Sequence, residues 1–196
     1  MHSIVVAAAT WTVGLAAVIV LPYATDSTST GDDLTRNTVR LALGYYAVAA
    51  ALMLVLKPSE WTGQGRGRLA RACWTLAWAA YLVHLAMAFH FYHHWSHSDA
   101  VRHTREISGF GEGIYVSHLF TLVWGADVAM WWLRPKAYAT RRPWIGIGLH
   151  AFMTFVIFNA TVVYESGPIR WVAIFAYAGL ATLVIYHRMS LPRAAQ

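Results

Sequence analysis

Four histidines lie within eight residues near the middle of the chain: His90, His93, His94 and His97. They come at the end of a long apolar run. If that run stays helical, a rotation of ~100° per residue places the four imidazoles within an arc of roughly 100°. Imidazole nitrogens are ligands for Zn, Cu and Fe, so this stripe predicts a transition-metal site.

Depth along the predicted membrane spans adds further candidates to this site. A helix rises ~1.5 Å per residue, which brings His118 to the level of His90 and places Glu165 at the same outer end. Glu165 would be a further ligand or the general base, and Tyr92, Tyr115 or Tyr164 would orient a substrate or donate a proton. The predicted metal ligands are His90, His93, His94, His97 and His118, and the predicted catalytic residues are Glu165 and Tyr164.

Other polar residues fall inside predicted spans, where ionisable groups are costly and often functional. His84 is expected near the middle of the third span, as a satisfied core histidine, a member of a proton relay or a cofactor-binding residue. Asp127 and His150 are expected at similar depth in the inner half, as a hydrogen-bonded pair between two helices. Solvated positions are expected for three loop or terminal histidines, His2, His103 and His187.

The composition is that of a membrane protein. Of the 196 residues, 58% are hydrophobic and only 12% are charged, and the ten Trp suit aromatic belts at the two membrane faces. A spanning helix needs ~20 mostly apolar residues. We therefore predict an all-α integral membrane protein, one domain over residues 1–196, built as a bundle of six transmembrane helices. The six predicted spans are 3–23, 39–56, 70–95, 114–133, 144–165 and 169–187.

The basic residues predict the orientation. Ten Lys and Arg flank the second and fourth loops and the C-terminal tail, whereas five lie on the other side among seven acidic residues. Under the positive-inside rule, the N- and C-termini are cytoplasmic and the histidine-rich loop faces outward. We expect the bacterial cytoplasmic (inner) membrane. The net charge of +6 is spread over these loops, so we expect no nucleic-acid partner.

The connections between the spans and the one cysteine give further predictions. Residues 25–38 read as a Ser/Thr/Asp-rich loop without chemistry, and the glycine-rich residues 63–68 read as a flexible turn rather than a phosphate loop. Ser96 and Asp99 have the spacing of a helix N-cap, which predicts a short helix to about Ser108. Cys73 is the single cysteine, which excludes an internal disulfide.

The segment His90-x-x-His93-His94 resembles one HxxHH box of the membrane fatty-acid desaturases and hydroxylases. The resemblance covers five residues. Those families use several boxes to hold a two-iron centre on the cytoplasmic side, whereas this chain has one box on the predicted outer side. We therefore infer no membership and transfer no residue roles.

Four functions fit these patterns. The leading hypothesis is a non-haem transition-metal site (Cu, Fe or Zn) in an oxidoreductase or hydroxylase, or else a hydrolase, that acts on a lipid or another hydrophobic small molecule. The second is a haem b electron carrier, with His84 or His90 and His118 as axial ligands. Metal transport or delivery is the third. The fourth is a non-catalytic subunit that associates with other membrane subunits or with further copies of itself.

Overall fold

The protein is all-helical. The structure, a computed structural model, describes residues 2–25 and 27–190. Within these residues, six helices are long and apolar enough to cross a membrane. They are α1 (His2–Ala24), α2 (Thr30–Leu54), α3 (Gly65–Phe91), α5 (Gly113–Leu133), α7 (Pro143–Phe158), which a π-helical turn η2 (Asn159–Val163) extends, and α8 (Pro168–Ser190).

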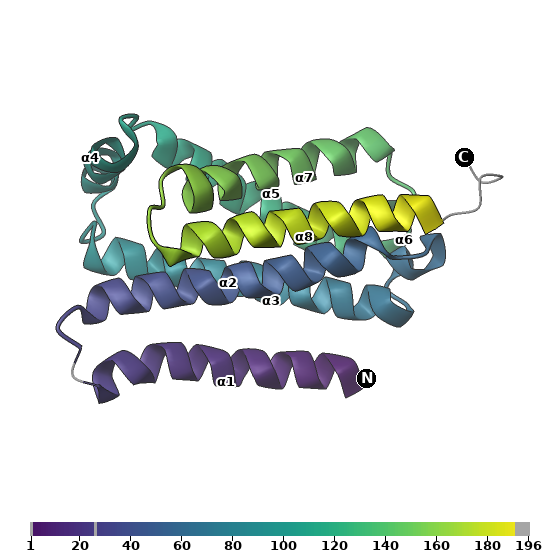
Figure 1. Ribbon diagram of the computed structural model, residues 1–196, viewed down its shortest axis with the longest axis horizontal. Coiled ribbons are helices and arrows are strands. Elements are labelled where there is room, and N and C mark those ends of the chain that lie inside the picture. Colours follow the sequence, from purple (N-terminus) through teal and green to yellow (C-terminus); the bar gives the residue numbers. More distant parts are fainter. Residues whose placement is uncertain (1, 26, 191–196) are drawn as a thin grey trace.

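The long helices lie alongside one another, and three short helices lie at the ends of the bundle (Figure 1). The histidine-rich end carries α4 (His97–Ser108), between the end of α3 and the start of α5. The opposite end, here called the basic end, carries the 3-10 turn η1 (Pro58–Thr62) and α6 (Pro135–Ala139). Helix α1 begins and α8 ends at the basic end, as an even number of spans requires (Figure 1).

The predicted class, a polytopic all-α membrane protein with six spans, is confirmed. The largest boundary difference concerns α2, which begins at Thr30 rather than at residue 39. Its first turn carries Asp32 and Asp33, whose negative charge favours a helix N-terminus. The hydroxyl of the buried Thr38 donates to the carbonyl of Leu34 and so adds no unsatisfied group. The segment read as a loop therefore contributes a full helical face to the bundle.

The predicted helical stripe of four histidines is wrong, because α3 ends at Phe91. His94 and Trp95 adopt left-handed backbone angles, with φ of 49° and 60°, which reverse the chain. The turn is closed by the Trp95 amide, which donates to the carbonyl of Phe89, 2.9 Å away. As a result His90 belongs to α3 and His97 opens α4.

Helix α4 itself follows the prediction. The Ser96 side chain accepts from the amide of Asp99 at 3.2 Å, which caps the first turn. The helix ends at Ser108, and Gly109 then takes a left-handed φ of 75°.

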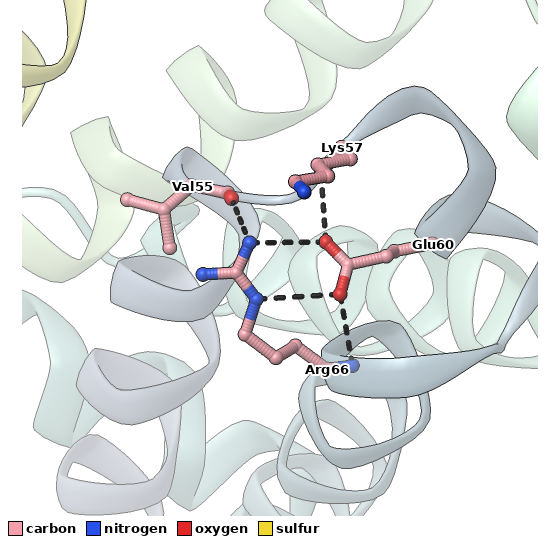
Figure 2. A network of polar contacts seen from close by, with 4 residues as sticks. All are labelled: Val55, Lys57, Glu60 and Arg66. Atoms are coloured by element: carbon pink, nitrogen blue, oxygen red, sulfur yellow. Dashed lines mark hydrogen bonds and ion pairs between the residues drawn. The ribbon is translucent and has the colours of Figure 1, made fainter. Parts of the chain in front are cut away.

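Glu60 fixes the turn between α2 and α3 (Figure 2). Its carboxylate accepts from the amides of Lys57 and Arg66 and forms an ion pair with the Arg66 guanidinium at 3.1 Å. The same guanidinium donates to the carbonyl of Val55 at 3.0 Å. The groups that donate to Glu60 lower its pKa to about 2, and the Arg66 side chain has the largest effect. Hydrogen bonds and an ion pair therefore hold the glycine-rich segment in a defined turn.

Asp127 joins three elements near the basic end. One carboxylate oxygen accepts from Trp74 Nε1 of α3 at 3.0 Å and from the Tyr138 hydroxyl of α6 at 2.9 Å. The other accepts from the Arg141 guanidinium at 2.6 Å. The side chains of Asp127 and Arg141 are only 2% and 10% exposed. These partners replace the expected hydrogen bond to His150.

We expect Asp127→Ala to lower the free energy of unfolding by about 3–5 kcal/mol, because it leaves the Arg141 charge buried without a partner. Thermal unfolding can be followed by the reactivity of the buried Cys73 thiol. The double variant Asp127→Leu with Arg141→Leu should recover part of the loss. Asp99→Ala, which removes a partly exposed surface pair with Arg102, serves as the control and should change little. Equal melting temperatures for Asp127→Ala and Asp99→Ala would contradict the assigned role.

Gly67→Ala should destabilise the α2–α3 turn. A Cβ at this position would lie 1.8 Å from the carbonyl oxygen of Glu60, so the backbone of the turn must shift. The matched control is Gly44→Ala on α2, where a Cβ has no atom within 4 Å. Alanine favours a helix over glycine, so this control should keep or raise the melting temperature. A melting temperature for Gly67→Ala as high as that of the control would argue against a close approach at Glu60.

Candidate functional site at the histidine-rich end

A polar pocket lies at the histidine-rich end, between α2, the end of α3 and α4. Its volume is about 420 Å³. The walls carry two imidazoles, a phenol, a carboxylate and a guanidinium. The lining residues are Asp32, Thr35, Arg36, Ala88, Tyr92, His93, His103 and Ile107.

His93 is the buried member of the pocket. It is 6% exposed, and its Nδ1 atom has no hydrogen-bond partner among the described residues. Burial, and next the neighbouring His103, lower the pKa of His93 below its usual range. The imidazole is therefore neutral at pH 7, with a lone pair on one nitrogen. A buried polar atom without a partner is uncommon and points to something that occupies the pocket.

His103 faces His93 across the pocket, although the sequence was interpreted as placing it in solvent. The two ring centroids are 5.4 Å apart, with an angle of 63° between the planes. His103 also stacks on Tyr92 at 5.4 Å, and its Nδ1 lies 3.8 Å from the Glu106 carboxylate. A signal was present in the sequence. His103 follows the buried Ala100 by three residues and precedes Ile107 by four, so all three share one face of α4.

Tyr92 and Asp32 connect α2 to the end of α3. The Tyr92 hydroxyl donates to the Asp32 carboxylate at 2.5 Å. Burial, together with this contact, raises the pKa of Tyr92 to about 12, so the phenol keeps its proton at physiological pH. This bond positions the ring on which His103 stacks. Asp32 lies in the segment predicted to be a loop, where the structure has the first turn of α2.

His97 and His118 form a second imidazole pair, between α4 and α5. Their centroids are 5.6 Å apart and their planes are nearly parallel, at 26°. The Phe89 ring separates this pair from the first: its centroid is 5.2 Å from that of His93 and 6.3 Å from that of His118. Of the five predicted ligands, His93 thus belongs to one pair, and His97 and His118 form the other.

The remaining predicted site residues lie apart from both pairs. His90 is exposed and packs on the ring of Phe91, and His94 is exposed on the turn. Glu165 accepts from the amides of Ser166 and Gly167, so its carboxylate is engaged by its own loop. Tyr164 is also exposed. Within residues 2–25 and 27–190, no group of three or more His, Cys, Asp and Glu side chains has the geometry to hold a metal ion.

His84 lies deeper in the bundle, on α3. Its Nδ1 is 2.9 Å from the carbonyl of Thr35, and a carbonyl only accepts, so Nδ1 carries the proton and Nε2 bears the lone pair. The ring neighbour of His84 is Tyr81, at 5.8 Å, whereas the ring neighbours of His118 are Phe89, His97 and Tyr115. The structure therefore gives the two proposed axial haem ligands different surroundings.

Comparison with known proteins returned no matching family model, no matching curated protein and no matching solved structure.

Cysteine cross-linking can test the division into two pairs. In a Cys73→Ala background, His97→Cys with His118→Cys should be joined in high yield by a short bis-methanethiosulfonate reagent, because α4 and α5 are in contact there. His90→Cys with His118→Cys should give little product. Cross-linked peptides are measured by mass spectrometry. Equal yields from the two cysteine variants would contradict the division of the histidines into two pairs.

Proposed function

We propose that this polytopic membrane protein binds a divalent transition-metal ion in the pocket at its histidine-rich end, through His93 and His103. The observation that carries the proposal is the buried, unpartnered Nδ1 of His93 in the pocket wall, with a second imidazole opposite. The positive-inside rule predicts that this end faces away from the cytoplasm, which would make the ion one taken from outside.

The spacing of the two rings supports a shared ion. Two imidazoles that bind one tetrahedral ion, with metal–nitrogen bonds of ~2.0–2.1 Å, place their centroids about 5 Å apart. The observed separation of 5.4 Å is close to this value. Metal ions bind the neutral imidazole, which is the form that the lowered pKa of His93 favours.

The charges around the pocket balance. Arg36 lines it and opposes a cation, whereas the carboxylate of Asp32 lines it on the same helix. Asp99 lies near enough to His93 to act on it electrostatically. Two protein ligands leave coordination positions for water or a small molecule, and open positions are what sites of metal transfer and metal catalysis have in common.

The test is to titrate the metal-free, detergent-purified protein with Zn²⁺ and to measure the heat of binding by calorimetry. Zn²⁺ is redox-inert, so binding is the event measured. His93→Asn and His103→Asn should each weaken binding by at least about tenfold, since even the loss of an outer hydrogen-bond partner costs 10–100-fold in affinity. Asparagine keeps a polar side chain of smaller size, which limits damage to the fold.

Two controls make the assignment specific. His94→Asn alters the exposed histidine beside His93 and should bind Zn²⁺ as the unmodified protein does. The double variant His97→Asn with His118→Asn removes the second pair and should keep the same affinity at the first. Loss of binding in this double variant, with binding retained in His93→Asn, would overturn the proposal.

A further inference from the structure

A second hollow lies within the apolar part of the bundle, on α7. It is a shallow groove of about 620 Å³ that opens sideways, toward the position of the membrane lipid. This volume lies within the ~300–1,000 Å³ of typical small-molecule sites. Its lining residues are Ile147, His150, Ala151, Thr154, Phe155 and Phe158.

His150 is the titratable residue among those that line the groove. The imidazole is largely buried, and it has no hydrogen bond to a described residue. Trp74 packs against it edge-on, with centroids 5.6 Å apart. Lipid chains offer no hydrogen bonds, so an imidazole facing them is costly unless another molecule supplies a partner.

Aromatic rings fill the interior behind the groove. Trp124 is 2% exposed and lies 5.0 Å from Trp74 between ring centroids, yet its Nε1 has no partner among the described residues. Tyr177 packs against Phe158, with ring centroids 5.6 Å apart. A neutral imidazole carries one N–H, so His150 in the groove wall suits a molecule that brings an acceptor oxygen.

The groove walls narrow the choice of molecule. Apart from His150 and Thr154 they are apolar, which favours an uncharged head group. Phe155 and Phe158 are exposed there, and their faces suit a planar ring. The groove opens at the depth of lipid chains, so the molecule is membrane-soluble. A quinone has all of these properties, because it is a flat, neutral, lipid-soluble ring that carries carbonyl oxygens.

We propose that this groove binds a membrane quinone, with one quinone carbonyl accepting a hydrogen bond from His150. The proposal concerns binding and does not depend on the metal site, which lies at the far end of the bundle.

The experiment is photolabelling of the protein in phosphatidylcholine vesicles with an azido-benzoquinone that carries a short alkyl tail. Label should be found by mass spectrometry in the peptide that contains α7, and excess decylubiquinone should prevent it. His150→Phe keeps an aromatic ring against Trp74 but removes the hydrogen bond, and should reduce the label at least fivefold. Ala151→Trp, at an exposed position in the groove, fills the space and should do the same.

The matched control is His118→Phe at the histidine-rich end, which should label like the unmodified protein. Equal labelling of α7 in His150→Phe and Ala151→Trp would overturn the proposal, as would label confined to other helices. Protection by dioleoylglycerol equal to that by decylubiquinone would also overturn it, because the groove would then accept any neutral carbonyl lipid. Failure of Zn²⁺ to bind would leave these results unaffected.

Discussion

The buried ion pair between Asp127 and Arg141 is the constraint on which the basic end of the bundle depends. A lone carboxylate would be costly so far from water, and it is tolerated because Arg141, Trp74 and Tyr138 all donate to it. The donors come from α3, α6 and the segment before α7, so satisfying one carboxylate places three elements around α5. The aromatic rings of the core pack inside this frame, among them Trp74 and Trp124, which are tilted at 45° with centroids 5.0 Å apart.

The fold could be predicted from the sequence because apolar length is a strong, local signal. Six runs of about twenty apolar residues leave few alternatives in a membrane, and the Ser96 cap with Gly109 delimits α4 equally well. The ends of helices were less predictable. The sequence around His94 carries no glycine or proline to mark the reversal, and left-handed angles at two consecutive non-glycine residues are set by tertiary contacts. Because α3 ends before this turn, the four histidines do not share one helix as predicted.

The site depends on contacts between residues distant in sequence, which periodicity does not report. Tyr92 reaches Asp32 over sixty residues, and Asp32 belongs to a polar stretch whose composition resembles a loop. His103 shares one face of α4 with the apolar residues Ala100 and Ile107, but the helix is mostly polar, so its charge pattern outweighed that spacing. Depth counting concerned the level of His118 relative to His90, whereas the ring that His118 contacts is that of His97, which opens α4.

The Phe89 ring between the two imidazole pairs has a consequence for how they communicate. An apolar ring offers no lone pair and no exchangeable proton, so no chain of hydrogen bonds can run from His93 to His118 through it. The two imidazole pairs therefore lie on either side of an apolar ring, and a change at one pair does not pass to the other through a hydrogen bond across that ring.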